Sequence, residues 1–477
     1  MKHHISLILA ASLLFLSCSN HKKAEHTDRV PEIYPDFAGS TLPANIAAPT
    51  FEINEDGSDF FTEIGKEGEE PVMTFSSKEI RPDLKKWHKL LAEAAGKNIY
   101  IRISVRNNEG KWERMKDIIC PVSSEPIDEY LVYRLLYPGY ELWNEMGIYQ
   151  RNLTDYQQEV VLENLSIDKQ CVNCHSFSKN APETMMIHVR GKQGGTLIRK
   201  DGTTEKVDPK CPGLENGATY PSWHSSGRFI AYSANNIQQF FHSKGTKTIE
   251  VSDLSADMTI YDVDNGKAFT SPAISGDEWM ETFPNWTPDG KTLYFCRSKA
   301  YKQGDPLDSV RYDLCKVSFD PDSLTIGEPE IVLNASEQGK SVSFPRVSPD
   351  GRWLLFTLSD YGNFSIWHPE SDLYLLDLQT GDIRLVDELN SDDVDSYHSW
   401  SSNGKWLVFS SKRMDGLWAR PFIASFNPET GIFTKPFVVP QKDPHYYDDF
   451  MKTYNIPELV RRPILNTDEF VSAVKKS

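Results

Sequence analysis

Alternation of apolar and polar residues with a period of two is the main pattern in the first third of the chain, and it predicts β-strands. Residues 99–105 and 130–136 alternate in this way and are rich in β-branched and aromatic side chains. Residues 82–95 instead place apolar side chains on one face at helical spacing. We therefore expect residues 45–150 to form a β-sandwich-like domain that carries one helix.

The second half of the chain repeats one pattern four times. Each copy opens on an aromatic residue, continues through a turn that contains glycine, and ends in an apolar strand. The copies begin at Tyr220, Phe283, Phe344 and Tyr397, which are 63, 61 and 53 residues apart. Glycine allows the positive φ that such tight turns require. Repeats of this length predict a β-propeller of five or six blades over residues 182–477, with a closing strand from the C-terminal tail.

The first 18 residues have the features of an export signal. The apolar run Leu7–Leu16 is too short to span a bilayer as a helix. It leads into Leu16-Ser17-Cys18-Ser19, which resembles a bacterial lipobox and implies a lipid on Cys18 that anchors the mature chain to a membrane. The alternative is an ordinary secretory signal with an incidental cysteine. We expect a periplasm-facing lipoprotein at the outer membrane, with residues 19–44 as a proline-containing linker.

A C-x-x-C-H motif at Cys171, Cys174 and His175 is typical of covalent haem c attachment. Two thiols at this spacing reach the two vinyl groups of one porphyrin edge, and the adjacent imidazole reaches the iron. We expect residues 151–181 to present the motif on a short helix that leads into a loop, with His175 as the proximal iron ligand. His188 is a candidate distal ligand.

Other interpretations of the two cysteines remain open at this point. A structural zinc site normally has four protein ligands, and the chain has no second C-x-x-C pair. A structural thiol pair or a disulfide would fit the same spacing. Covalent haem attachment in bacteria takes place outside the cytoplasm, so the export signal and the haem motif support each other.

Composition narrows the class of protein. The net charge of -17 argues against a nucleic-acid partner, because phosphate binding requires clustered Lys and Arg. It is compatible with docking to a basic redox partner. The chain has no Ser-His-Asp order and no H-E-x-x-H motif. We therefore expect an electron carrier or a binding protein rather than a hydrolase.

The repeats resemble the TolB-type propeller repeat, as FPNWTPDGK from Phe283 and FPRVSPDGR from Phe344 illustrate. The copies from Tyr220 and Tyr397 lack the Pro-Asp of that pattern. The resemblance implies one blade per copy and an interaction platform rather than an enzyme. With the lipobox and C-V-N-C-H, the whole chain is similar to Bacteroidetes lipoproteins described as TolB-like or cytochrome-c-related.

Two functions follow from these patterns. The first is a membrane-anchored monohaem protein that transfers electrons and docks a redox or envelope protein partner through the propeller. The alternative is a non-redox binding or scaffold lipoprotein that holds a protein or a glycan, with a structural thiol pair. Trp87, Trp112 and Trp143 would provide a sugar platform, although tryptophan in a sandwich more often belongs to the core.

Overall fold

The chain folds mainly as β-sheet, which confirms the predicted fold class. The computed structural model describes residues 24–137, 145–214, 218–241, 243, 247 and 249–476. The signal peptide and the predicted lipidation site Cys18 lie outside these residues. The described residues form two units. Unit 1 contains residues 24–126, 154–156 and 437–450, and unit 2 contains the rest.

Unit 1 has two sheets, one long helix and the short helix α3 (Tyr446–Asp449), in agreement with the predicted β-sandwich-like domain. The strands of the larger sheet are β1 (Glu25–His26), β9 (Trp112–Arg114), β8 (Asn98–Arg106), β10 (Ile118–Ser123), β3 (Leu42–Pro43), β5 (Asp59–Lys66) and β6 (Met73–Phe75). The smaller sheet consists of β2 (Ile33–Tyr34), β4 (Phe51–Ile53) and β7 (Glu79–Ile80). Residues 24–44, expected to be linker, thus supply three short strands.

The helix α2 (Leu84–Ala94) lies where the sequence predicts a helix. Its N-terminal cap is Asp83, whose carboxylate accepts a hydrogen bond from the backbone N–H of Lys86 at 2.9 Å. The helix buries Trp87, whose indole N–H donates to the carbonyl of Ile46. Trp87 is therefore core, Trp112 is half-buried on β9, and Trp143 lies outside the described residues. The buried Trp87 is therefore not part of a sugar platform.

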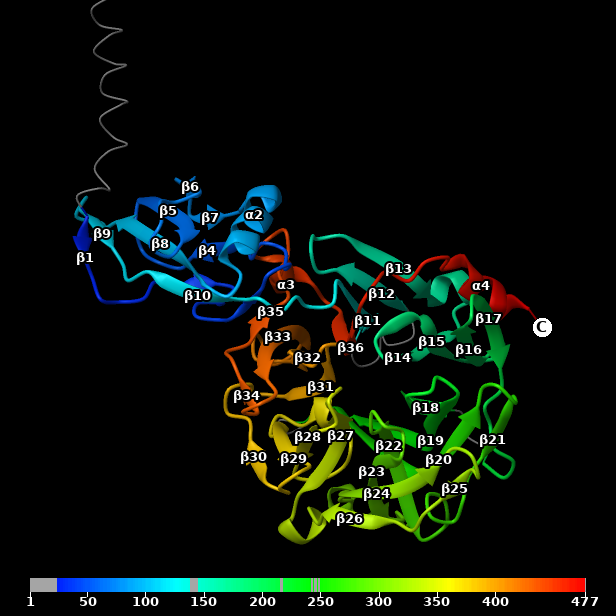
Figure 1. Ribbon diagram of the computed structural model, residues 1–477. Helices are drawn as coiled ribbons and strands as arrows, with labels where there is room; N and C mark the ends of the chain where they lie inside the picture. The colour runs from blue at the N-terminus through cyan, green and yellow to red at the C-terminus, as the bar shows by residue number, and fades with distance from the viewer. Residues whose placement is uncertain are drawn as a thin grey trace, which may run out of the picture. The chain divides into compact units, whose positions relative to one another are not determined.

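Unit 2 contains six sheets (Figure 1). Five of them are built on four strands in sequential order, and the sixth combines the C-terminal strand β36 with β11, β12 and β13. Blade 2 is β14 (Cys171–Ser178), β15 (Ala181–Arg190), β16 (Gly195–Lys200) and β17 (Thr203–Val207). Blade 3 is β18 (Ala218–Trp223), β19 (Phe229–Phe241), β20 (Ile249–Asp262) and β21 (Lys267–Phe269). Blade 4 is β22 (Trp279–Trp286), β23 (Thr292–Lys299), β24 (Asp313–Asp320) and β25 (Thr325–Ile326), with the added strand β26 (Glu330–Leu333).

The remaining blades complete a closed ring. Blade 5 is β27 (Ser341–Val347), β28 (Trp353–Ser359), β29 (Asp372–Asp377) and β30 (Ile383–Leu385). Blade 6 is β31 (Asp395–Trp400), β32 (Trp406–Ser411), β33 (Arg420–Asn427) and β34 (Ile432–Phe433). Blade 1 joins both parts of unit 2: β36 (Thr453–Val460) pairs with β11 (Tyr130–Leu136), which is followed by β12 (Met146–Asn152) and β13 (Gln158–Glu163).

The inner strands β36, β14, β18, β22, β27 and β31 contact one another in that order, and β31 contacts β36 again. The structure is therefore a six-bladed propeller closed by a C-terminal strand, as predicted. A short C-terminal helix, α4 (Asp468–Lys475), packs on the outer strands of blade 2.

Two local expectations differ from the structure. Residues 130–152 belong to the propeller rather than to the sandwich, because their alternation predicts strands but does not reveal that β11 pairs with β36. The segment expected to carry the cysteines on a helix consists instead of β13, the 3₁₀ turn Asn164–Ile167 and β14. The β-branched pair Val160-Val161 favours the strand that forms there.

The aromatic residue that opens each repeat, which we call position 1, points to the propeller axis. At Tyr220, Phe283, Phe344 and Tyr397 a β-bulge gives φ values of 47°, 53°, 51° and 50°. Ile456 of β36 has the same conformation, with φ of 48°. The ring centroid of Phe344 lies 4.1 Å from that of Phe283 and 4.5 Å from that of Tyr397. These four rings form an aromatic plug across the axis.

Replacing Phe344 by alanine should destabilise the propeller. The side chain is fully buried in the plug, so its loss removes apolar contacts and leaves a cavity that costs about 3–5 kcal/mol. Thermal and urea unfolding would measure the change. Ile331→Ala on β26 is the matched control, because Ile331 is 62% exposed and its truncation should change stability by no more than about 0.5 kcal/mol. Equal effects of the two substitutions would contradict the plug.

Candidate functional site

A cavity of about 170 Å³ lies on the propeller axis on one side of the aromatic plug, and we call it the axial cavity. The early residues of the inner strands form its base. The long hairpin of β19 and β20 and the loops that precede β29 and β33 form its walls. Its polar and charged lining residues are Arg134, Asn173, Cys174, Arg190, Thr219, Tyr220, Gln239, Tyr397, Lys412, Thr453 and Asn455.

The lining of the axial cavity is cationic. It includes Arg134, Arg190 and Lys412, and it includes no Asp or Glu. The guanidinium of Arg134 donates to the amide oxygen of Asn173 at 2.6 Å, and the other two cations have no hydrogen-bond or ion-pair partner among the described side chains. Three positive charges thus meet in one recess of a chain whose net charge is -17.

Lys412 is the most unusual of the three cations because it is only 7% exposed. Its ammonium lies 4.5 Å from the ring centroid of Trp367, which offers a cation–π contact but no counter-charge. Burial lowers the pKa of Lys412 to about 8, against the opposing effect of Asp393 and Asp415. Neither carboxylate forms an ion pair with Lys412 within 4.0 Å, so an anion in the cavity would add a direct partner for its ammonium.

The predicted haem residues occupy different environments on β14. Cys174 lines the axial cavity, whereas Cys171 is buried in a small cluster with Leu136 and Met146. Burial raises the pKa of the Cys171 thiol, against the effects of Arg134 and Arg190. Both thiols are free in the structure, so they form no disulfide.

His175 is buried and does not line the axial cavity. Burial, reinforced by the charge of Arg134, lowers the pKa of its imidazole to about 3, although the backbone carbonyls of Val132 and Ile456 act in the opposite direction. Neither ring nitrogen makes a hydrogen bond of ordinary geometry within the described residues. His175 is therefore neutral in the folded chain.

The strand geometry of β14 does not fit haem c. A register shift between Val172 and His175 places Asn173 and Cys174 both on the wall of the axial cavity, whereas His175 is buried and does not line it. A porphyrin joined to the Cys174 sulfur in the cavity would not place its iron on His175 with this backbone. Haem attachment stays a prediction from the motif, and it would require residues 171–175 to leave the strand.

His188, the candidate distal ligand, is also buried in blade 2 and does not line the cavity. Its Nδ1 lies 2.9 Å from the hydroxyl of Thr196 on the neighbouring strand. Burial has the largest effect on the pKa of His188, and together with the charges of Arg190 and Lys210 it lowers that pKa to about 3. The structure thus brings Cys174 and the cavity together but does not bring His188 to either.

Two of the three cations of the axial cavity, Arg134 and Lys412, were not identified from the sequence. Arg134 and Arg190 end or interrupt apolar strands, where a charged residue normally marks the solvent side. Lys412 follows the strand of the fourth repeat and lies in a sequence typical of a surface turn. Their convergence depends on three different blades, and no local pattern encodes it.

A second, wider cavity of about 480 Å³ opens on the other side of the plug. Its lining includes Arg346 and Glu458, which come from the inner strands of blades 5 and 1. Burial raises the pKa of Glu458 to about 7, against the effect of Arg346. The two side chains form no ion pair within 4.0 Å among the described residues, so this cavity carries charge of both signs.

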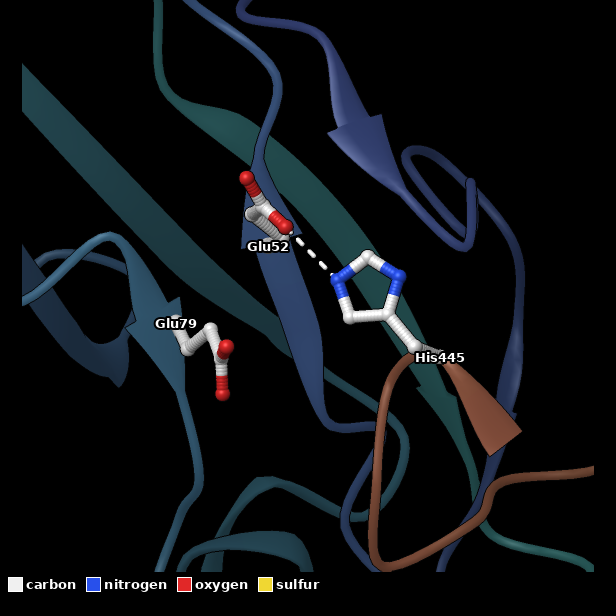
Figure 2. A group of neighbouring side chains, drawn as sticks. All are labelled: Glu52, Glu79 and His445. Atoms are coloured by element: carbon white, nitrogen blue, oxygen red, sulfur yellow. Dashed lines mark hydrogen bonds and ion pairs between the residues drawn. The ribbon is translucent and has the colours of Figure 1, made fainter. Parts of the chain in front are cut away.

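Unit 1 contains a separate cluster of candidate metal ligands, formed by Glu52, Glu79 and His445 (Figure 2). One ligand atom from each lies within 4.8 Å of the others. The Nε2 of His445 is 2.6 Å from the Glu52 carboxylate, and Lys78 approaches the same carboxylate at 2.5 Å. The cluster combines residues from β4, β7 and the segment 437–450.

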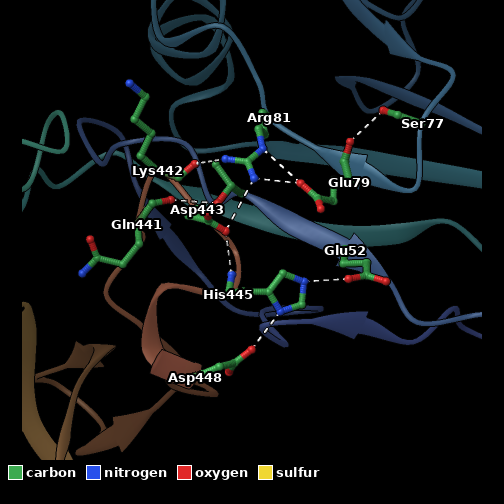
Figure 3. A network of polar contacts seen from close by, with 10 residues as sticks. Glu52, Ser77, Glu79, Arg81, Gln441, Lys442, Asp443, His445 and Asp448 are labelled. Carbon is green, nitrogen blue, oxygen red and sulfur yellow. Dashed lines mark hydrogen bonds and ion pairs between the residues drawn. The ribbon is translucent and has the colours of Figure 1, made fainter. Parts of the chain in front are cut away.

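The surrounding contacts indicate an ion-pair network rather than a metal centre (Figure 3). Arg81 donates to Glu79 at 2.7 Å and to the carbonyl of Lys442 at 2.8 Å. The Nδ1 of His445 lies 2.8 Å from Asp448. Hydrogen bonds to Asp448 and Glu52 raise the pKa of His445, which favours the imidazolium, whereas a metal would require the neutral ring. The network holds residues 437–450 on the N-terminal sheets of unit 1.

Several solved structures are distantly similar to this chain. No family model matches the chain, and no curated protein matches it. A puromycin-hydrolysing peptidase of Mycobacterium tuberculosis is 12% identical with a TM-score of 0.37, and the match covers 73% of this chain and 52% of that one. The chain thus spans about half the length of this peptidase. Other matches are prolyl endopeptidases and oligopeptidases.

In two further similar structures, the match covers nearly the whole length of the other chain. An auxiliary nutrient binding protein of Bacteroides thetaiotaomicron is 12% identical, with a TM-score of 0.32 and coverage of 81% of this chain and 96% of that one. A periplasmic gluconolactonase of Pseudomonas aeruginosa is 13% identical, with a TM-score of 0.34 and coverage of 65% and 97%.

The comparisons correct one expectation. The sequence analysis expected an electron carrier or a binding protein rather than an enzyme, partly because TolB-type repeats imply an interaction platform. Most of the similar structures are peptidases, so the architecture does not exclude catalysis and that expectation does not stand. Among the described residues, no helix has both the length and the apolar character needed to cross a bilayer.

The raised pKa of His445 predicts a pH-dependent contribution to the stability of unit 1. The imidazolium pairs with Glu52 and Asp448, so this stabilisation is fully present below the unfolded pKa and is lost as pH rises through the folded pKa. His445→Gln should therefore lower the free energy of unfolding by less than about 1 kcal/mol near pH 5.5, and by much less near pH 9. Urea unfolding at the two pH values would measure it. A loss that grows with pH would contradict the network.

Proposed function

We propose that the chain binds an anionic ligand in the axial cavity. The observation that carries this proposal is the group of three cations without carboxylate partners, one of them a lysine that is more than nine-tenths buried. A buried charge without a counter-charge destabilises a fold, so its presence in a recess open to solvent favours a ligand that neutralises it.

The remaining walls of the cavity suggest what the anion is attached to. The apolar side chains Leu136, Ile237, Val251, Ile366 and Trp367 line the same recess as the cations. A recess that combines cations with apolar walls suits a small molecule with an anionic group on an apolar body. We therefore propose a ligand with a carboxylate, phosphate or sulfonate group on an aliphatic or aromatic body.

The location of the chain is part of the proposal. The apolar run before Cys18 and the Leu16-Ser17-Cys18-Ser19 sequence support export and a lipid anchor at the outer membrane, with the propeller facing the periplasm. A ligand of envelope origin would reach the cavity there, and an envelope protein that delivers or receives it would be the partner of the propeller.

The fluorescent sulfonate 8-anilino-1-naphthalenesulfonate is a suitable probe because it joins an anion to an apolar body. Lys412→Met should weaken its binding by roughly tenfold, since a charged contact of about 1.5 kcal/mol is lost. Fluorescence titration of the folded protein would measure the affinity. The neutral analogue N-phenyl-1-naphthylamine should bind wild type and variant alike.

A control variant and a series of pH values make this binding test specific to Lys412. Lys302→Met removes an exposed lysine outside the cavity and should leave the affinity unchanged. Wild-type affinity should fall as pH rises above about 8, where Lys412 loses its proton, and Lys412→Arg should bind the sulfonate with little change across that range. An affinity that is independent of Lys412 at every pH would overturn the proposal.

A second candidate function is the one that the C-x-x-C-H motif predicts. The chain would then be a monohaem c-type protein that transfers electrons to a basic redox partner. The C-x-x-C-H spacing supports it, as does the position of Cys174 on the cavity wall beside Arg134 and Arg190, which would suit haem propionates. The strand geometry of His175 opposes it.

Expression in a bacterial host with haem-maturation machinery tests this second candidate. The haem function predicts a haem absorption spectrum and a polypeptide mass that includes one porphyrin, both lost in the Cys171→Ala/Cys174→Ala variant. The anion-binding function predicts the mass of the polypeptide with two free thiols. Intact-mass measurement of the exported protein distinguishes the two.

A further inference from the structure

Hydrogen bonds between blades show which residue of blade 2 corresponds to position 1 of the repeat. The indole N–H of Trp400 in blade 6 donates to the carbonyl of Arg346, two residues after Phe344 in blade 5. The indole N–H of Trp223 in blade 3 donates in the same way to the carbonyl of Ser176 in blade 2. Ser176 is therefore the equivalent of Arg346, and Cys174 is the equivalent of Phe344.

The histidine of the motif follows the same correspondence. His175 comes directly after position 1, as His398 does in the repeat that begins at Tyr397. His398 is buried, and its Nε2 lies 2.9 Å from the carbonyl of Leu355 in the preceding blade. Leu355 pairs with Arg346 in that blade.

In blade 1, which precedes blade 2, Val132 pairs with Glu458, so Val132 is the counterpart of Leu355. The carbonyl of Val132 raises the pKa of the His175 imidazole, against the larger effect of burial. Burial lowers the pKa of both imidazoles, His175 and His398, to about 3. The two histidines thus occupy equivalent positions between blades.

We infer that C-x-x-C-H is the blade 2 copy of the repeat segment, and that Cys174 sets the size of the axial cavity by replacing an aromatic ring. This inference rests on the proposed function, since it names the residue that limits which ligand enters. Position 1 is aromatic in four blades and is Cys174 and Ile456 in the neighbouring blades 2 and 1.

The two small members of the ring explain where the cavity lies. Cys174 and Ile456 both line it, together with the position 1 rings of Tyr220 and Tyr397 at the sides. Phe283 and Phe344 do not line it, because they close the plug on the other side of the axis. An aromatic side chain at residue 174 would extend into the space that the ligand needs.

The substitution Cys174→Phe tests the inference by restoring the aromatic residue of the other blades. We expect the variant to fold with an unchanged or higher melting temperature and to bind 8-anilino-1-naphthalenesulfonate at least tenfold more weakly. Ile331→Phe is the control, because it adds the same ring at an exposed position of β26 and should leave both properties unchanged. Wild-type affinity in a folded Cys174→Phe protein would overturn the inference.

Alkylation of the wild-type chain provides a measurement that does not depend on the variant. Iodoacetate is an anion, and the cations of the cavity should concentrate it at Cys174. The thiolate sulfur forms a bond to the methylene carbon while the carbon–iodine bond breaks, iodide leaves, and the thiol proton passes to buffer. Peptide mass analysis should find carboxymethylation at Cys174 before Cys120, Cys296 or Cys315, which are fully buried.

The outcomes separate this inference from the proposed function. Equal labelling of Cys174 and Cys296, or a chain isolated with both thiols of the motif bound to haem, would overturn the assignment of the motif to the repeat. Failure of the wild-type chain to bind the sulfonate, with Cys174 still labelled first, would overturn anion binding and leave the placement of Cys174 standing.

Discussion

The pairing of β36 with β11 is the interaction on which the rest of unit 2 depends. It joins the C-terminal strand to three strands from the first third of the chain, so that blade 1 exists only when both parts meet. The pairing places Ile456 beside blade 2 and leaves no open edge among the six inner strands. The aromatic plug, the axial cavity and the wider cavity all follow from this closure, because each takes residues from several blades.

Within the closed ring, the side chain at position 1 of each repeat decides where the axis is filled and where it is left open. Aromatic rings at position 1 fill the axis in four blades, and the smaller side chains of Cys174 and Ile456 leave room beside them. The cations then come from outside the repeat: Arg134 and Arg190 lie on second strands, and Lys412 lies in a loop. A stable scaffold with a regular plug can therefore carry a binding site that differs in chemistry from its own repeats.

The sequence predicted the elements better than the site. Periodicity and turn glycines identified four blades, and the helix at Leu84–Ala94 followed from its apolar face. The copies of the repeat at Cys174 and Ile456 were not recognised in the sequence because neither begins with an aromatic residue. The spacing of Cys171, Cys174 and His175 can be recognised in the sequence. The role of these residues depends on the backbone carbonyls around His175, which come from strands distant in sequence.

The most direct test of the account is a crystal structure of the wild-type chain soaked with 4-bromobenzoate, with the bromine located by its anomalous signal. The account predicts a bromine peak inside the axial cavity and the carboxylate within hydrogen-bond reach of Lys412 and Arg190. Well-diffracting crystals with the bromine bound only outside that cavity would contradict it.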